Sequence, residues 1–150
     1  MGGTQRQIAA LVNGLSSRGY RCKIWVMDDA GGAFTEEVRQ CGATVEGIFS
    51  GIGPVGVVSR LVYRTLALPG LALARSLRRD RPRVLQCFHD ECNLIGALAG
   101  RLAGVPVVAL GVRSLHPRDT AWSDRAHWAT PYDAMDPRSV DAVIVNSEAG

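Results

Sequence analysis

Residues 82–110 read PRVLQCFHDECNLIGALAGRLAGVPVVAL. The pattern predicts a strand over 83–88 and then a helix over 92–103, which Gly104 ends. The helix carries one apolar stripe, made of Leu94, Ile95, Leu98 and Leu102. A second strand is predicted over 106–110, where no polar residue interrupts the run, as is typical of the middle of a parallel sheet. The stretch therefore indicates a strand–helix–strand unit with parallel strands.

The same alternation of helix and strand continues on both sides of this unit. Before it we expect helices over 4–18 and 34–40, strands over 22–27 and 43–48, and a long helical region over 57–79, kinked at Pro69-Gly70. After it we expect an irregular or weakly helical stretch over 111–138 and a buried strand over 141–145. This alternation predicts a single α/β domain over residues 1–150 with a doubly wound parallel sheet.

Composition excludes several classes of protein. The chain has 150 residues, 47% of them hydrophobic and 21% charged, as in ordinary globular proteins. No secretory signal leads it, and no apolar run approaches the ~20 residues of a membrane span. The four cysteines lack metal-ligand spacing and are interpreted as free thiols in a reducing compartment: Cys22, Cys41, Cys87 and Cys92. We therefore expect a cytoplasmic protein without a metal site.

Charge is concentrated in one stretch, although the net charge is only +3. Residues 60–83 hold one acid, Asp80, and seven arginines: Arg60, Arg64, Arg75, Arg78, Arg79, Arg81 and Arg83. One interpretation is peripheral contact with an anionic membrane surface at the inner face, through Arg60, Arg64, Arg75, Arg78 and Arg79. The other is the solvated side of an amphipathic helix packed on the sheet. A nucleic-acid partner is not expected, because Tyr63 is the only aromatic residue in the stretch.

A glycine-rich turn, Gly2-Gly3-Thr4, precedes the first helix. We expect Thr4 to be the N-cap, with Gln7 completing a capping box, and an apolar stripe of Ile8, Leu11, Val12 and Leu15. Free N–H groups and the helix dipole at such a turn favour phosphate or sugar binding. A tight turn without a ligand is the alternative, because neither the dinucleotide-binding glycine pattern nor the ATPase phosphate loop is present.

A polar triplet, His89-Asp90-Glu91, follows the strand over 83–88. Ligands of parallel sheets bind at the carboxyl ends of the strands, which is where this triplet lies. His89 there can act as a general base or orient a substrate hydroxyl near pH 7. Asp90 or Glu91 can instead cap the following helix. His116 and His127 have no ligand-like spacing to His89, so no metal site is indicated.

Arg113 and Ser114 follow the fully apolar strand in the same way. An arginine at this position suits binding of an anion or a hydroxyl group. The alternative is an ordinary surface arginine. The stretch after it carries Trp122, Trp128 and Tyr132, so it is not a featureless linker.

Five stretches together resemble family 4 glycosyltransferases of the GT-B fold. They are GGTQRQ at 2–7 with LSSRGYRC at 15–22, PRVLQCFH at 82–89, NLIG at 93–96, RLAGVPVV at 101–108 and DAVIVNS at 141–147. The resemblance implies a Rossmann-like N-terminal half of a GT-B fold, whose first strand is missing before Gly2. It also implies a C-terminal nucleotide-sugar-binding domain with an E-x7-E motif, which this sequence does not contain. We therefore expect a piece of a larger enzyme that is inactive alone.

The resemblance further implies transfer of a sugar from a nucleotide-diphosphate sugar, with retention and without a metal or other cofactor. The acceptor would be a surface glycan or a glycolipid. Gly2, Gly3 and Thr4 would approach the donor diphosphate, and His89 would be the catalytic histidine. The acceptor side would include Gln5, Asp90, Glu91, Asn93, Arg113 and Ser114. Counted back from Asn93, however, the family's second histidine falls on Phe88 and its first on Gln86, so Asp90 and Glu91 stay alternatives to His89.

Two other classes of function stay open at this point. One is a non-catalytic α/β binding module that acts through a partner. The other is a nucleotide-binding oxidoreductase, which the absence of the G-x-G-x-x-G pattern disfavours even though Asp28 follows an early strand.

Overall fold

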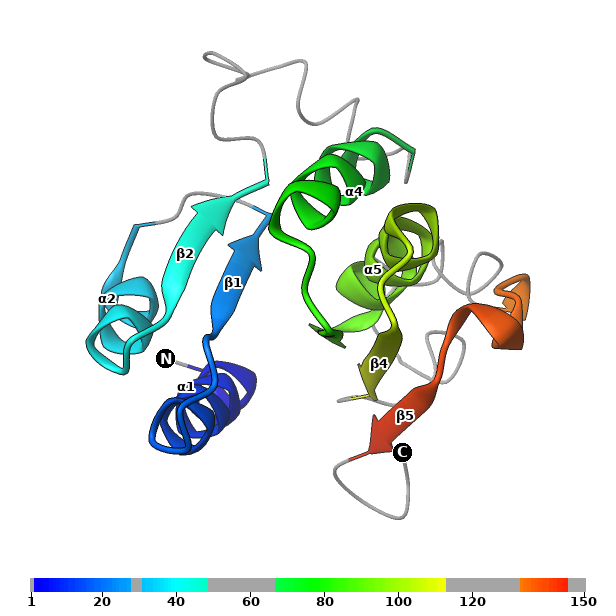
Figure 1. The fold of residues 1–150 in the computed structure, drawn as a ribbon. Helices are drawn as coiled ribbons and strands as arrows, with labels where there is room; N and C mark the ends of the chain where they lie inside the picture. The colour runs from blue at the N-terminus through cyan, green and yellow to red at the C-terminus, as the bar shows by residue number, and fades with distance from the viewer. Residues whose placement is uncertain (1, 28–30, 49–66, 113–132, 146–150) are drawn as a thin grey trace, which may run out of the picture. The chain divides into compact units, whose positions relative to one another are not determined.

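The structure, a computed structural model, describes residues 2–27, 31–48, 67–112 and 133–145. Helices alternate with strands along these residues, and every described strand pair is parallel (Figure 1). The predicted α/β class is therefore confirmed. The chain divides into two compact units, Met1–Gly56 and Val57–Gly150, each with its own sheet.

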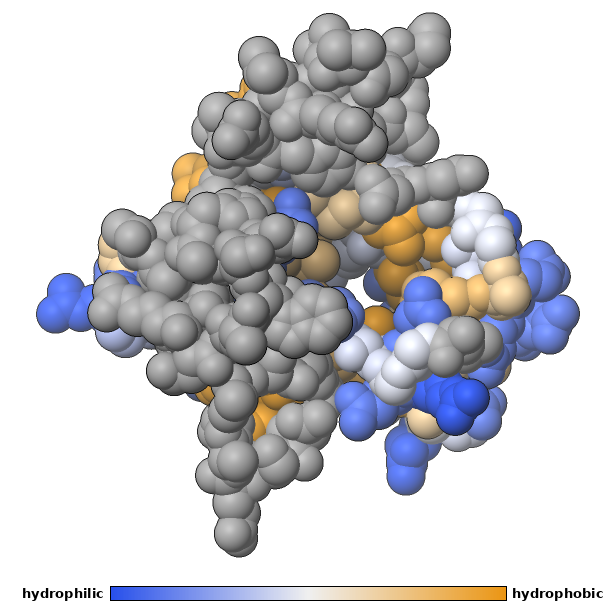
Figure 2. Space-filling model, turned by 180° about the vertical axis from the view of Figure 1, so that it is seen from behind, coloured by the Kyte–Doolittle hydropathy of each residue, from blue (hydrophilic) through white to orange (hydrophobic). Residues whose placement is uncertain are grey.

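The first unit contains a two-stranded sheet and two helices. Its elements are α1 (Gly3–Ser16), β1 (Lys23–Val26), α2 (Ala33–Gln40) and β2 (Thr44–Gly47). The core consists of Ala9, Val12, Val38 and Ala43, against which Ile8, Ile24, Phe34 and Val45 pack. Hydrophilic residues lie over the outer sides of α1 and α2 (Figure 2). One apolar side of each helix therefore covers the sheet, as its sequence period requires.

The start of α1 differs from the prediction. The N-cap is Gly2 and not Thr4, and Gln5 rather than Gln7 closes the turn, because its Oε1 accepts a hydrogen bond from Gly2 N at 3.0 Å. The predicted stripe is wrong at Leu11, which is 37% exposed, since Ala9 takes the place beside Val12 in the core. The helix ends at Ser16, two residues before the predicted end.

The second unit contains three parallel strands in the order β3-β4-β5. Its elements are α4 (Ala67–Asp80), β3 (Val84–Phe88), α5 (Asp90–Ala103), β4 (Val107–Val112), a 3-10 turn η2 (Pro137–Ser139) and β5 (Ala142–Val145). Helix α5 packs on β3 and β4, and α4 packs on α5. The fully apolar strand lies in the middle of this sheet, as predicted. Pro69 and Gly70, where a kink was predicted, lie in the first turn of the described helix α4, and the predicted helical stretch before them, 57–66, lies outside the described residues.

Small residues of α5 face the sheet in place of part of the predicted leucine stripe. Leu94 and Ile95 are buried as expected, but Leu98 and Leu102 are 39% and 40% exposed. Gly96 and Gly100 are buried instead, against side chains of β3 and β4. Glycines let the helix backbone approach the sheet closely, which turns the longer leucines to the rim. Gly104 ends the helix in the left-handed conformation, as predicted.

The last strand, β5, is more exposed than predicted. Val143 keeps 59% of its surface, and Ile144 and Val145 are exposed too. In the described sheet β5 pairs with β4 alone, and α5 covers β3 and β4. Asp141 sets its register, because its N–H donates to Val108 O at 2.9 Å and its Oδ2 accepts from Val108 N at 2.8 Å. Among the described helices, none has the length and apolar character to cross a membrane.

Candidate active site

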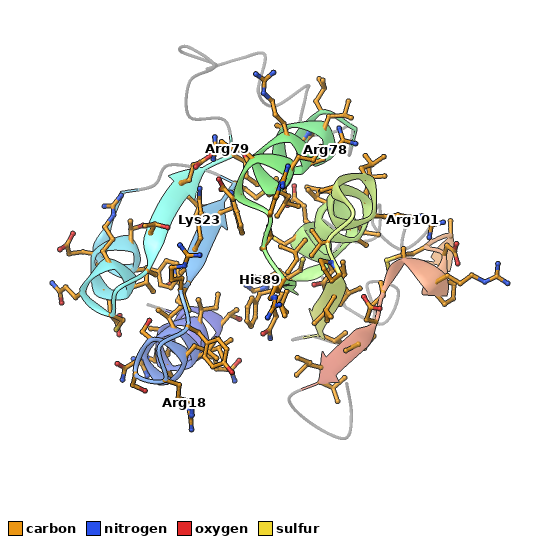
Figure 3. The ribbon with its side chains drawn as sticks, in the orientation of Figure 1. Arg18, Lys23, Arg78, Arg79, His89 and Arg101 are labelled. Atoms are coloured by element: carbon orange, nitrogen blue, oxygen red, sulfur yellow. The ribbon has the colours of Figure 1, made fainter. Side chains whose placement is uncertain are left out.

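The junction between β3 and α5 is the clearest candidate site. Phe88 ends β3 opposite Gly111 of β4, and α5 begins two residues later at Asp90. His89 is the only residue between the two elements, and it is the N-cap of α5. Its side chain is exposed at the carboxyl edge of the sheet (Figure 3). The predicted catalytic residue therefore lies where ligands of parallel sheets bind.

The backbone of His89 is strained. Its φ of 75° and ψ of 154° fall in a region that is essentially reserved for glycine. Holding a side-chain-bearing residue there costs about 1–3 kcal/mol, and such conformations cluster at active sites and ligand clamps. The sequence contains no signal for this strain, because the residue is a histidine and not a glycine. The backbone thus adds an independent reason to consider His89 a functional residue.

Asn93 fixes the first turn of α5 to the sheet. Its side chain is 0% exposed, and its Nδ2 donates to Gly111 O at 3.1 Å. Its backbone N–H donates to His89 O at 2.8 Å, which is the first bond of the helix. Asn93 was expected to bind the acceptor, and that role stays a prediction; in the structure its buried Nδ2 contacts the Gly111 carbonyl. Sequence reasoning missed Gly111, because a carbonyl at a strand end carries no residue-type signal.

Asp90 and Glu91 are in the first turn of α5, beside His89. Neither is the helix cap, because α5 starts earlier than the predicted 92 and His89 takes that position, with no capping hydrogen bond from its side chain. Carboxylates in a first turn are stabilised by the positive end of the helix dipole. Asp90 is 6% exposed, whereas Glu91 is half-buried. Of the two, Glu91 is the more accessible to a ligand.

Cys87 is buried in β3, two residues before His89, and its thiol is unreactive. Burial, with a smaller effect of the Cys92 thiol, raises the pKa of Cys87 from its ordinary 9.0 to about 12. A thiol that stays protonated is a poor nucleophile and a poor metal ligand. All four cysteines are free thiols, as predicted. No group of three or more His, Cys, Asp or Glu side chains in the described ranges could hold a metal ion.

The glycines at the start of α1, Gly2 and Gly3, are not packed against other described residues. Neither Gly2 nor Gly3 has a positive φ, and a Cβ at either would meet no described atom within 4 Å. Packing among the described residues therefore does not require glycine at either position. Gly2 has no side-chain oxygen to accept the first-turn N–H groups. Gln5 is exposed, and its Oε1 is bonded to Gly2 N, as described above.

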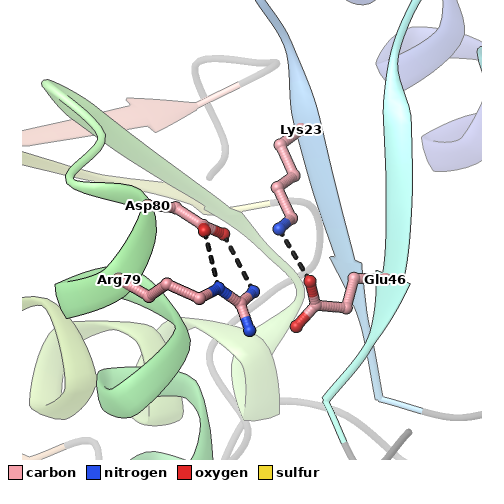
Figure 4. Close-up of polar contacts among 4 residues, drawn as sticks. All are labelled: Lys23, Glu46, Arg79 and Asp80. Atoms are coloured by element: carbon pink, nitrogen blue, oxygen red, sulfur yellow. Dashed lines mark hydrogen bonds and ion pairs between the residues drawn. The ribbon is translucent and has the colours of Figure 1, made fainter.

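The remaining predicted residues divide into two groups. Arg60, Arg64, Arg113 and Ser114 lie outside the described residues. The other three arginines are exposed on α4: Arg75, Arg78 and Arg79. Arg78 Nη2 donates to Leu102 O at 2.6 Å, at the end of α5. Arg79 pairs with Asp80 at 2.8 Å (Figure 4). Arg78 and Arg79 therefore each have an interaction within the protein.

A further polar cluster, which sequence reasoning missed, lies on β1 and β2. Lys23 Nζ is 2.7 Å from Glu46 Oε2 (Figure 4). It also lies 5.4 Å from the centroid of the Trp25 ring. Residues two apart on a strand share a face, so Lys23 and Trp25 lie together opposite the side that carries Ile24. The alternation of these residue types was visible in the sequence. The cluster is a partly buried ion pair on one face of the strands, and we assign it no catalytic role.

Comparison with known proteins gives one match. The family model for Glycosyltransferase Family 4 matches residues 1–150. Neither the curated proteins nor the solved structures include a match to the chain. The parallel α/β architecture is consistent with a Rossmann-like N-terminal domain of the GT-B fold, as the five sequence stretches implied. The family model covers residues 1–150, and the chain therefore belongs to glycosyltransferase family 4.

Proposed function

We propose that the enzyme containing this domain transfers a sugar from a nucleotide-diphosphate sugar to a surface glycan or a glycolipid. In this reaction the bond between the anomeric carbon and the diphosphate breaks, and a bond to an acceptor hydroxyl oxygen forms. The hydroxyl proton leaves, the nucleoside diphosphate departs, and the anomeric configuration is retained. Membership of family 4 supports the transferase class. The reaction proceeds without a metal or other cofactor.

His89 is the catalytic residue in this proposal. The observation that carries it is the strained backbone of His89, which presents the imidazole at the carboxyl edge of the sheet. An imidazole titrates near neutral pH, so it can accept or orient the acceptor hydroxyl proton. Asp90 and Glu91 lie within the same turn and contribute on the acceptor side, together with Gln5, Arg113 and Ser114.

Gly2, Gly3 and Thr4 form the donor-phosphate loop. Two observations support this role: neither glycine is required by packing among the described residues, and the N-cap lacks a side chain that would compete for the first-turn N–H groups. A phosphate placed there would meet backbone donors and the positive end of the α1 dipole. Replacing Gly3 by Val should therefore raise the KM for the donor and leave the KM for the acceptor unchanged.

Peripheral membrane contact through α4 suits a lipid-linked acceptor. Leu68 and Leu71 are 50% and 55% exposed on this helix, and Arg75 lies one turn further along, also exposed. Apolar side chains followed by cations on one side of a helix favour binding at an anionic lipid surface. Sedimentation with vesicles of phosphatidylglycerol, compared with phosphatidylcholine vesicles, tests this contact. Equal binding to both, or to neither, would count against it.

The decisive experiment uses the full-length enzyme encoded at the gene's own locus. Release of UDP or GDP is measured with UDP-glucose, UDP-galactose, UDP-N-acetylglucosamine and GDP-mannose, in the presence of EDTA and a lipid extract as acceptor. Transfer by the wild type and a fall in kcat of about 10²-fold or more in His89→Ala are expected. Gly14→Ala is the control and should keep the wild-type rate, because a Cβ at this half-buried position of α1 meets only the end of the Arg18 side chain. A normal rate in His89→Ala would transfer the role to Asp90 or Glu91, and no transfer with any donor would favour a non-catalytic binding module.

A further inference from the structure

We propose that Asn93 is a positioning residue, which holds the backbone of His89 in its strained conformation and does not contact the acceptor. The proposal rests on the function proposed above for His89. It replaces the acceptor-binding role that the sequence suggested for Asn93. Three observations carry it: the shared anchor at Gly111, the bond to the His89 carbonyl, and the complete burial of the Asn93 side chain.

Gly111 anchors the chain on both sides of His89. On one side, Phe88 is the register partner of Gly111 in the ladder between β3 and β4. On the other side, Asn93 Nδ2 donates to Gly111 O at 3.1 Å. The chain must therefore leave the strand and enter the helix within a short, fixed span. His89 is the single residue that makes this turn, and so it takes the positive φ.

Asn93 also holds His89 directly. The backbone N–H of Asn93 donates to His89 O at 2.8 Å, so the carbonyl of His89 points along the helix. The side chain of Asn93 fixes the position of that N–H, because the carboxamide is held against β4. A strained conformation persists only when its surroundings over-determine it, and these two bonds supply that restraint. Without the carboxamide bond, the first turn of α5 can shift and His89 can relax.

The burial of the Asn93 side chain argues against a direct role in ligand binding. The side chain of Asn93 is 0% exposed, in a turn where His89 is exposed and Glu91 half-buried. A substrate at the carboxyl edge would therefore meet His89 and not Asn93. The predicted consequence is specific: loss of the Asn93 carboxamide should change the rate of the chemical step more than substrate binding.

The test compares Asn93→Ala, Asn93→Ser and Gly100→Ala with the wild type in the full-length enzyme. Gly100→Ala is the matched control, since it strains the packing of the same helix on Val108, about two turns from Asn93 and about three from His89. The first readout is the ¹³Cα and ¹³Cβ chemical shifts of His89, assigned with His89→Gln, because they report backbone φ and ψ. The second is kcat and KM with whichever of UDP-glucose and GDP-mannose is the better donor. Asn93→Ser retains a small polar group and serves if Asn93→Ala does not fold.

Both Asn93 variants should shift the His89 resonances, whereas Gly100→Ala should leave them in place. We expect kcat to fall by up to about 10²-fold in the Asn93 variants, with KM changed little, as for a displaced catalytic group. Unchanged His89 shifts would overturn the proposal. So would a rise in acceptor KM at constant kcat, which would mark Asn93 as a binding residue. If His89→Ala is fully active, the proposed function of His89 fails, and the chemical shifts still decide whether Asn93 holds its backbone.

Discussion

Gly96 of α5 lies directly on the thiol of Cys87 in β3, and a Cβ at position 96 would overlap Cys87 Sγ. The contact explains why α5 presents small residues to the sheet. Gly96→Ala should therefore destabilise the protein: overpacking of a core costs about 1–3 kcal/mol, which exceeds the helix propensity gained from alanine. The measurement is the urea midpoint at constant slope, which reports the free energy of unfolding.

The double variant Cys87→Ala/Gly96→Ala isolates this contact. Removing the thiol makes room for the new methyl group, so the second substitution should cost much less than in the wild-type background. Gly14→Ala is the matched control, because a Cβ there meets only the flexible end of Arg18, at 3.5 Å. It should stabilise the protein by up to about 1 kcal/mol. Additive effects at residues 87 and 96 would contradict the close approach of α5 to β3.

Cys87 should be protected from alkylation in the folded protein. Its pKa is raised to about 12 by burial, so almost no thiolate exists at pH 8. Labelling with iodoacetamide, followed by mass spectrometry, should modify the half-buried Cys22 and Cys41 first and Cys87 only on unfolding. Modification of Cys87 as fast as Cys22 would contradict its burial.

The same pKa shift predicts a loss of stability at alkaline pH. The unfolded thiol ionises near 9.0 and the folded one near 12, so the unfolded state loses its proton first. The free energy of unfolding should therefore fall as pH rises above 9.0, toward 12. Cys87→Ala should remove this part of the slope while leaving the contributions of other groups. An identical slope in the variant and the wild type would show that Cys87 does not contribute.

Comparing Arg75→Ala with Arg78→Ala should distinguish an effect on lipid binding from an effect on the free energy of unfolding. Arg78 bonds to Leu102 O at the carboxyl end of α5, so Arg78→Ala should lower the free energy of unfolding by about 1 kcal/mol. Arg75→Ala, on the same helix and also exposed, should leave stability nearly unchanged. On phosphatidylglycerol vesicles both variants should lose similar affinity, about 1 kcal/mol for each cation near the surface. Loss of binding in Arg78→Ala alone would attribute it to helix packing and not to charge.

Sequence patterns were sufficient for the order and type of the described elements, because these depend on local periodicity. The run over 106–110 has no polar residue, and the strand there is indeed central. Gly104 ends α5 as predicted, since a left-handed residue at that position favours glycine. Local signals of this kind do not depend on what the element packs against.

Orientation and exposure could not be predicted, because they depend on tertiary contacts. Leu98 and Leu102 have the correct spacing for a core stripe, yet Gly96 and Gly100 take the inner positions by close approach to the sheet. Strand β5 is as apolar as β4, but it pairs with β4 alone in the described sheet. At the candidate site, the sequence singled out His89 and Asn93. The different roles that we propose for them rest on burial and backbone geometry, which the residue types do not encode.

His89→Gly and His89→Ala should differ in stability although both lack the imidazole. Glycine adopts a φ of 75° with a ψ of 154° without the side-chain clash that alanine suffers. Relief of the strain, partly offset by the greater flexibility of glycine in the unfolded chain, should leave His89→Gly more stable than His89→Ala by about 1 kcal/mol. Thermal or urea unfolding of the two variants measures this difference.

Arg81 provides the matched control for this pair, because it is exposed and also has a positive φ, of 49°. Arg81→Gly should likewise be more stable than Arg81→Ala, with sugar transfer unaffected in both. If the imidazole of His89 performs the chemistry, His89→Gly and His89→Ala should lose kcat equally, by about 10²-fold or more. A rate retained by His89→Gly but lost in His89→Ala would mean that the position contributes its backbone shape alone, and that the reacting group lies elsewhere in the turn.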